Sequence, residues 1–150
     1  GSEMCIRDSI DFVQDNFSKS KRGVLRGFHF QKPPFDQSKL VSCISGKVLD
    51  IALDLRKESP TFGKYKAVIL SKKNKLQKFI PKGFAHAFLV LSQTAVFTYK
   101  VDNIYAPDFD SGVLWNDPLL NIDWKIPKSQ LIISEKDQKL KTFNEFHNPF

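Results

Sequence analysis

The sequence has 150 residues and a formal net charge of +7, so it is long enough for one domain with its own core. Apolar residues make up 41% and charged residues 26%, which excludes a disordered chain, and two cysteines are too few for a disulfide framework. No apolar stretch is long enough to cross a membrane and no secretory signal opens the sequence, so we expect a cytoplasmic protein with no membrane partner.

The first nine residues differ from the rest of the sequence. Gly1-Ser2 resembles a cloning scar, and residues 3–9 show neither a period nor turn residues. We therefore treat residues 1–9 as a leader that is foreign to the fold. Residues 10–150 are expected to form a single domain.

Short strands are predicted along this domain, because apolar and polar residues alternate between Gly and Pro positions. The clearest strand is Val48–Leu55, with leucine and isoleucine on one face and Asp50 and Asp54 on the other. Helix is expected only as a turn or two near Leu119 and in the C-terminal tail. The expected strands are 24–31, 40–44, 48–55, 65–70, 77–80, 87–91 and 96–101.

Many short strands without amphipathic helices between them predict an all-β fold, either a sandwich or a jelly roll. The 14 phenylalanines suit a core between two facing sheets. The spacing Pro81-x-Gly83-x-x-His86 is typical of cupin-like jelly rolls. Such barrels often hold a metal on a His-x-His pair, a Glu and this last histidine. Here Gln31 occupies the position of the second histidine of a His-x-His pair, and the third histidine, His147, lies in the tail. We therefore expect no metal site.

The polar residues inside this pattern each have an ordinary structural explanation. His29 suits a half-buried histidine, Tyr99 a core aromatic and Lys39 a solvated strand start. Asp50 and Asp54 either line a wet cavity or face solvent, because buried carboxylates need partners. No single residue identifies a site.

The positive charge favours an anionic ligand, which could be nucleic acid, a membrane surface or a phosphorylated small molecule. The basic residues fall into short groups at 19–22, 72–78 and 136–141, and each group alone is typical of a solvated strand end. The sequence contains no recognition-helix pattern and no basic strand face with interleaved aromatic residues. A nucleic-acid partner is therefore not expected.

Taken in chain order, these residues resemble the dTDP-4-dehydrorhamnose 3,5-epimerase family. The signature strand is Gly23–Gln31, and the resemblance is collinear from Phe12 to Asp137. The other matching segments are Gln14–Asn16, the segment around Lys39, Gly46–Arg56, Ser59–Gly63, Ile80–Ser92, Tyr99-Lys100, Tyr105–Pro107, Trp115–Pro118, Ile122–Trp124 and Ser134–Asp137.

This resemblance implies a metal-free, cofactor-free cupin-like jelly roll that forms a homodimer and acts on a nucleotide-linked 4-keto-6-deoxy sugar. It implies that His29 is the catalytic base and that Asp137 orients it. Tyr99 matches the acid on the opposite face of the sugar, and Lys39 matches a lysine near the keto oxygen. The substrate-binding residues implied by the resemblance are Gln14, Asn16, Arg26, Gln31, His86, Tyr105 and Lys136, with Asp50 supporting His86.

The sequence departs from the family in two places. Phe17 stands where a histidine is usual, and the family's N-terminal stretch is replaced by residues 1–9. We therefore expect the domain to lack the family's N-terminal strands. Three alternatives remain open: a related 3- or 5-epimerase, a ketoisomerase, or a cupin that binds a sugar nucleotide without catalysis.

Three geometric predictions can be tested: two follow from the strand assignment, and the contact between His29 and Asp137 is implied by the resemblance. Arg26 and His29 point to opposite faces of a flat strand, so both can face a ligand only if the strand bulges, most easily at Gly27. His29 and Asp137 are expected to lie within hydrogen-bonding distance. The leucine and isoleucine face of 48–55 is expected to pack between two sheets, while Asp50 faces the cavity.

Overall fold

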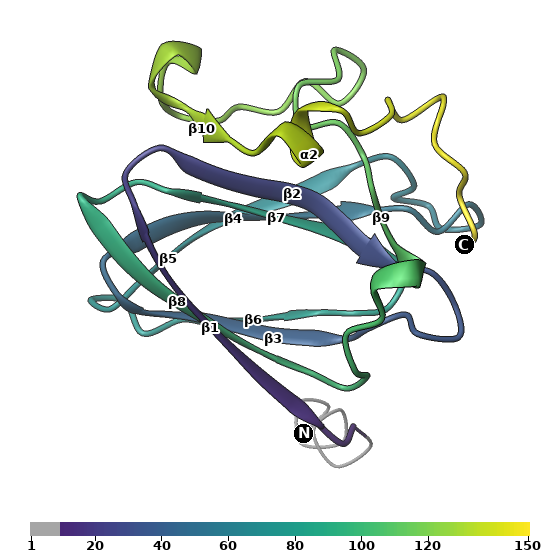
Figure 1. Ribbon diagram of the computed structural model, residues 1–150, viewed down its shortest axis with the longest axis horizontal. Coiled ribbons are helices and arrows are strands. Elements are labelled where there is room, and N and C mark those ends of the chain that lie inside the picture. The colour runs from purple at the N-terminus through teal and green to yellow at the C-terminus, as the bar shows by residue number, and fades with distance from the viewer. Residues whose placement is uncertain (1–9) are drawn as a thin grey trace.

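Two β-sheets face each other, and a layer of loops and short helices covers the outer side of one of them (Figure 1). The structure is a computed structural model that describes residues 10–150, so the expected leader at 1–9 lies outside the described residues. The strands are β1 (Gln14–Lys21), β2 (Val24–Gln31), β3 (Lys39–Ser45), β4 (Lys47–Asp54), β5 (Tyr65–Ser71), β6 (Gln77–Ile80), β7 (Phe84–Val90), β8 (Thr94–Val101), β9 (Asp110–Gly112) and β10 (Ile132–Ile133). The short helices are η1 (Pro107–Phe109), η2 (Lys128–Gln130) and α2 (Glu135–Gln138).

The four-stranded sheet has the order β1-β8-β3-β6, and the six-stranded sheet has the order β10-β2-β7-β4-β5, with β9 paired to β2. The pairings are antiparallel except that of β10 with β2. The expected all-β, cupin-like jelly roll is confirmed. None of the helices among the described residues is long and apolar enough to cross a membrane.

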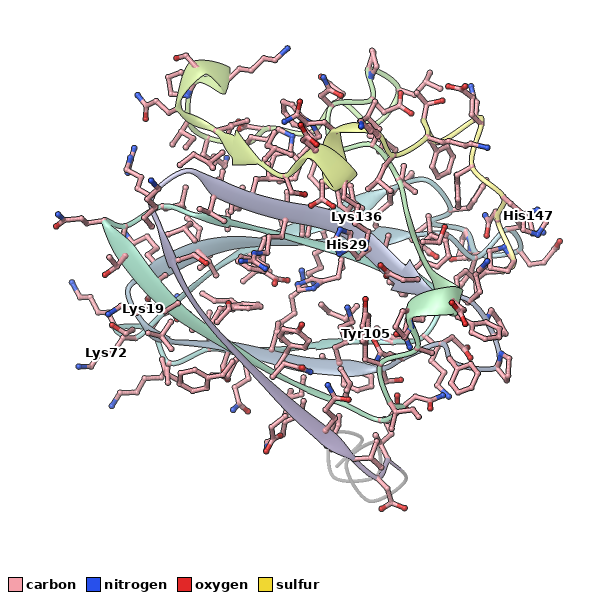
Figure 2. The ribbon with its side chains drawn as sticks, viewed as in Figure 1. Lys19, His29, Lys72, Tyr105, Lys136 and His147 are labelled. Atoms are coloured by element: carbon pink, nitrogen blue, oxygen red, sulfur yellow. The ribbon has the colours of Figure 1, made fainter. Side chains whose placement is uncertain are left out.

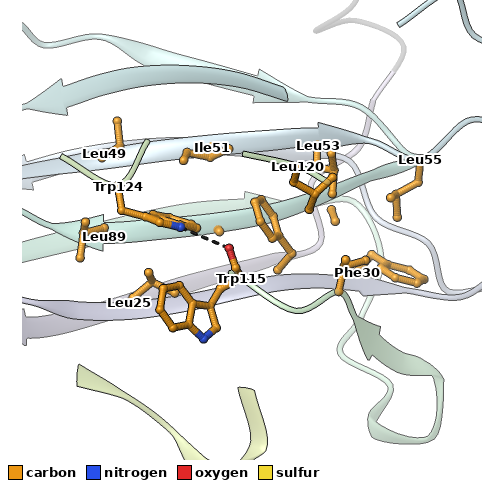
Figure 3. Close-up of a cluster of buried hydrophobic side chains, with 14 residues drawn as sticks. Leu25, Phe30, Leu49, Ile51, Leu53, Leu55, Leu89, Trp115, Leu120 and Trp124 are labelled. Carbon is orange, nitrogen blue, oxygen red and sulfur yellow. Dashed lines mark hydrogen bonds between the residues drawn. The ribbon is translucent and has the colours of Figure 1, made fainter. Parts of the chain in front are cut away.

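The faces of β4 correct one prediction. The side with Leu49 and Ile51 does not pack between the sheets; it packs on the outside of the six-stranded sheet against Trp115 and Trp124 (Figure 3). The Trp124 indole N–H donates to the Trp115 carbonyl at 3.2 Å and fixes this layer. The prediction was wrong because the segment after β9 adds a third layer, so both faces of β4 are buried.

The opposite side of β4 faces the four-stranded sheet, where Val48 and Ala52 join the apolar cluster between the sheets. Asp50 lies on this side and points between the sheets, as predicted, but it is fully buried and does not line a cavity. Asp54 faces neither a wet cavity nor solvent. Its carboxylate is buried and accepts hydrogen bonds from Arg56, Ser59 and Thr61 in the loop after the strand.

The predicted strands are present, with ends shifted by up to three residues. The sequence pattern missed β1, because its sequence QDNFSKSK carries no apolar alternation. The region near Leu119 forms a turn and not a helix, whereas α2 supplies the expected helical turn of the C-terminal tail.

Candidate active site

A cavity of about 300 Å³ lies between the sheets, at the end where β2 finishes and β3 begins. Figure 2 shows His29 on β2 and Tyr105 below it at this end of the sandwich. Seven of the eleven predicted site residues contribute to the lining. The lining residues are Gln14, Asn16, His29, Phe30, Gln31, Gln37, Lys39, Tyr99, Tyr105 and Asp110.

The predicted hydrogen bond between His29 and Asp137 is present, with 2.6 Å between Nε2 and Oδ1. The other carboxylate oxygen of Asp137 accepts the backbone N–H of Gly27 at 3.1 Å. Burial alone would raise the pKa of Asp137, but these hydrogen bonds and the nearby His29 hold it below its ordinary value. The carboxylate therefore stays ionised and fixes the ring of His29, which lines the cavity.

Asp137 reaches His29 because the C-terminal segment crosses over β2 before it turns into α2. Ser134 caps this helical turn, since its hydroxyl accepts the backbone N–H of Asp137 at 3.1 Å. The cap fixes the backbone at Asp137, and through it the carboxylate that holds the histidine.

The predicted bulge in β2 is present at Gly27. Arg26 pairs with Phe88 and His29 with His86, so β2 contains one more residue than β7 between these two pairs. Gly27 has φ +127°, and a Cβ there would lie 2.6 Å from the Cβ of Ala87, so only glycine fits. The bulge brings Arg26 and His29 to the same side of the strand.

Arg26 is exposed and does not line the cavity. Its charge nevertheless acts on Tyr99. Burial raises the pKa of the Tyr99 hydroxyl, and the positive charge of Arg26 opposes that rise only in part. Tyr99 is therefore neutral at physiological pH and can donate a proton.

Lys39 and Tyr99 come from the sheet that faces His29. The Lys39 ammonium lies 5.6 Å from the centre of the Tyr99 ring. Burial lowers the pKa of Lys39 to about 8, against the attraction of Asp50 and Asp110. Lys39 thus remains mostly protonated at neutral pH, and it loses its charge as the pH rises above about 8.

Gln14 and Asn16 point from β1 into the cavity, where the Gln14 amide donates to the Asn16 side-chain oxygen at 2.9 Å. The Gln14 oxygen accepts the backbone N–H of Tyr105 at 3.3 Å, which ties the strand to the loop beyond β8. Lys136 does not line the cavity but pairs with the lining residue Asp110. Hydrogen bonding to Asp110 raises the pKa of Lys136, so this lysine is charged.

Two predicted binding residues have their polar atoms occupied within the protein. The amide of Gln31 donates to the carbonyls of Phe35 and Ile104 and accepts the backbone N–H of Ala106, so it anchors two loops. His86 is buried, bonds to Asp50 at 2.6 Å and does not line the cavity. Gln31 therefore shapes the cavity wall, whereas His86 lies beside the lining residue His29.

Besides the apolar Phe30, sequence reasoning missed two polar lining residues, Gln37 and Asp110. Both lie in or beside loops, where no alternation indicates which side chain faces inward. The pairing of Asp110 with Gln31 across β9 and β2 places it at the cavity, and this long-range contact has no local signal.

A larger cavity of about 380 Å³ lies under the C-terminal layer, lined by residues that include Trp115, Lys128 and Gln138. It contains none of the predicted site residues and no acid–base pair. Among residues 10–150, no group of three His, Cys, Asp or Glu side chains is arranged to hold a metal ion.

Comparisons with known proteins agree with this arrangement. A family model described as dTDP-4-dehydrorhamnose 3,5-epimerase matches residues 3–145. The epimerase of that name from Escherichia coli K12 is 52% identical over 136 residues, which cover 91% of this chain and 73% of the relative.

Solved structures are similar over the whole sandwich. The dTDP-4-dehydrorhamnose 3,5-epimerase from Elizabethkingia anophelis is 56% identical, with a TM-score of 0.88 over 89% of this chain and 73% of that chain. The dTDP-6-deoxy-D-glucose-3,5-epimerase from Legionella pneumophila, in complex with dTDP-4-keto-L-rhamnose, is 47% identical. Its TM-score is 0.91 over 97% of this chain and 76% of that chain.

Proposed function

Because the chain belongs to the dTDP-4-dehydrorhamnose 3,5-epimerase family, we propose that it inverts C3 and C5 of dTDP-4-keto-6-deoxy-glucose to give dTDP-4-keto-rhamnose. The single observation that carries this proposal is the opposition of an acid and a base across one cavity. His29 extends from the six-stranded sheet, and Tyr99 extends from the four-stranded sheet that faces it.

Epimerisation next to a keto group needs a base, an acid and a positive charge near the keto oxygen, and we assign these roles to His29, Tyr99 and Lys39. A 4-keto group acidifies the hydrogens at C3 and C5, because the resulting carbanion is delocalised into an enolate. His29 removes the proton, and the electron pair of the C–H bond moves toward the keto oxygen. The Lys39 ammonium stabilises the charge on that oxygen.

Inversion requires that the new proton arrives from the other face of the sugar. The neutral Tyr99 hydroxyl donates it to the carbon, and the carbon–hydrogen bond forms there as the enolate returns to a ketone. The tyrosinate and the protonated His29 then regain their starting states by exchanging protons with solvent. Asp137 stabilises the protonated imidazole throughout.

For the nucleotide diphosphate we propose Gln14, Asn16, Arg26 and Lys136, with Tyr105 at the exposed rim of the cavity. The net charge of +7 supports an anionic ligand of this kind. The alternatives are inversion at one carbon only, ketoisomerisation, and binding of a sugar nucleotide without catalysis.

We further propose that the enzyme is a cytoplasmic homodimer. The outer side of the four-stranded sheet has no covering layer among the described residues (Figure 1). Phe17 on β1 is 70% exposed. An uncovered sheet face with large apolar side chains suits a second copy of the chain. The buried free thiol of Cys43 suits a reducing compartment.

The test is incubation with dTDP-4-keto-6-deoxy-glucose in deuterated water, followed by mass spectrometry and NMR of the sugar. We expect deuterium at both C3 and C5 and the inverted product. Deuterium at one carbon identifies a single-site epimerase. Tight binding without exchange contradicts the catalytic proposal and leaves the binding alternative.

A further inference from the structure

Lys78 connects the two sheets on the side of the sandwich away from β1. It projects inward from β6, the edge strand of the four-stranded sheet, and its side chain is only 11% exposed. The ammonium donates to the backbone carbonyl of Lys66 at 3.0 Å and lies 3.1 Å from Oδ1 of Asp50. Lys78 therefore has acceptors on β5 and β4 of the opposite sheet.

Asp50 needs such a partner because its carboxylate has no access to water. Its neighbours on the same face of the sheet are Val68 and Phe88, which are apolar. One carboxylate oxygen accepts from His86 Nε2 at 2.6 Å, and the other has Lys78 as its charged neighbour. A buried carboxylate requires a positive charge in its surroundings, and Lys78 supplies it directly.

His86 can therefore remain neutral. Burial lowers the pKa of His86, and the positive charges of Lys39 and Lys78 lower it further. The Asp50 carboxylate acts in the opposite direction and raises it. The pKa of Asp50 stays below its ordinary value although burial raises it, because His86 and Lys78 both favour its ionised form. The group thus holds one negative charge on Asp50 and one positive charge on Lys78.

The protonation state of His86 matters because its neighbour is the catalytic base. His29 and His86 are direct cross-strand partners on β2 and β7 and point to the same side of the sheet. During the proposed reaction His29 becomes positively charged. A second positive charge on His86 would oppose that step.

We infer that Lys78 is a positioning residue of the active site, because its ammonium lies 3.1 Å from the buried Asp50 carboxylate, balances its charge and thereby keeps His86 neutral beside His29. The link to catalysis rests on the proposed function. The charge arrangement itself can be tested in the protein alone. Without Lys78, Asp50 must take its positive charge from a proton on His86.

The first experiment replaces Lys78 by Met and follows the ring nitrogens of His86 by NMR as a function of pH. We expect a neutral His86 near pH 7 in the wild-type protein and a protonated His86 in K78M. Lys78→Arg keeps the charge and should restore the neutral ring. Lys66→Met removes an exposed lysine of β5 that lies next to Lys78, and it should leave His86 neutral.

Circular dichroism and thermal unfolding show whether K78M is folded, and Lys78→Gln provides a second variant if it is not. An identical, neutral His86 in the wild-type protein and in a folded K78M or K78Q overturns the inference. So does a protonated His86 in the wild-type protein.

The second experiment measures kcat with the nucleotide sugar. We expect K78M to lose about tenfold in kcat, because a cation beside His29 opposes its protonation, with little change in KM and with recovery in K78R. A protonated His86 together with an unchanged kcat overturns the coupling to His29. If the wild-type protein itself does not turn over this substrate, the proposed function fails while the NMR result still decides the role of Lys78.

Discussion

Among the described residues there are two His–Asp pairs, whose histidines lie side by side on one sheet; both pairs have the same hydrogen-bond length, 2.6 Å, but different surroundings. The side chain of His29 is 32% exposed and reaches the cavity, whereas that of His86 is 6% exposed and enclosed. The geometry of a pair therefore does not determine its role. Only His29 lines the cavity, so it is the histidine for which we propose contact with the substrate, whereas His86 is enclosed.

The carboxylates differ in the same way. Asp137 belongs to a capped turn in the C-terminal layer and binds His29 and a backbone N–H. Asp50 lies in the middle of β4 and is balanced by Lys78. We expect damage to the first pair to abolish chemistry and damage to the second to cost stability.

The largest effect is expected for His29→Asn. Asparagine keeps part of the shape and hydrogen bonding but has no useful basicity, so both deuterium exchange and product formation should cease. His147→Asn is the matched control, since His147 is exposed on the C-terminal tail away from the cavity (Figure 2), and it should be fully active. A folded His29→Asn protein with normal turnover would contradict the proposed mechanism.

Tyr99→Phe separates the acid from the base. The ring should stay packed near Phe97, so folding is preserved, but no proton can be delivered from that side. Exchange should continue while the inverted product falls about 10²–10⁴-fold, the usual range for a general acid or base. Mass spectrometry measures exchange, and NMR measures inversion.

Tyr65→Phe on β5 is the control for this variant, because Tyr65 packs against the outer cluster and does not line the cavity. It should leave both quantities unchanged. If Tyr99→Phe stops exchange as completely as His29→Asn, then Tyr99 acts in binding or in proton removal and not as the acid.

The third comparison concerns stability. Asp50→Asn leaves the Lys78 charge buried without its partner, and we expect a loss of about 3–5 kcal/mol in the free energy of unfolding. Asp137→Asn breaks a pair whose histidine reaches the cavity and should cost about 1 kcal/mol. Urea unfolding at pH 7 measures both. Equal losses would show that enclosure does not distinguish the two pairs.

The stability of the protein should depend on pH through both carboxylates. The pKa values of Asp50 and Asp137 are lower in the fold than their ordinary values, so both carboxylates stabilise the protein above about pH 4. This contribution is lost as the pH falls through the values in the folded protein. Each Asn variant should therefore show a shallower loss of stability in acid than the wild-type protein.

Sequence patterns predicted most of the fold and part of the site. Alternation located the interior strands, because it is a local feature. The bulge at Gly27 was expected only on the condition, implied by the family resemblance, that Arg26 and His29 both face the ligand. The covering of β4 by Trp115 and Trp124 was missed, since nothing in an alternating strand shows that a distant segment will bury its second face.

The same limit applies to the residues around the catalytic pair. The sequence predicted the His29–Asp137 contact only through a family resemblance. Lys78 looked like one member of a solvated basic group, because its partner Asp50 lies on another strand of the opposite sheet. Contacts between sheets depend on how the whole sandwich closes, and short sequence windows do not contain that information.

The smallest predicted effect concerns Lys39, whose pKa is lowered to about 8 by burial. As the pH rises above 8, Lys39 loses the charge that we propose stabilises the enolate, and kcat/KM should fall about tenfold for each further pH unit. Lys39→Arg stays charged throughout this range, so its profile should lack this alkaline limb even if its overall rate is lower.

Unfolding cannot produce the same limb through Lys39. In the unfolded chain this lysine keeps its proton up to its ordinary pKa of 10.5, so between about pH 8 and 10.5 the unfolded state binds more protons than the folded state. The contribution of Lys39 to stability therefore rises over the interval in which activity falls. Circular dichroism recorded beside the kinetics should show a folded protein at pH 9. A limb that persists unchanged in Lys39→Arg would assign it to another group.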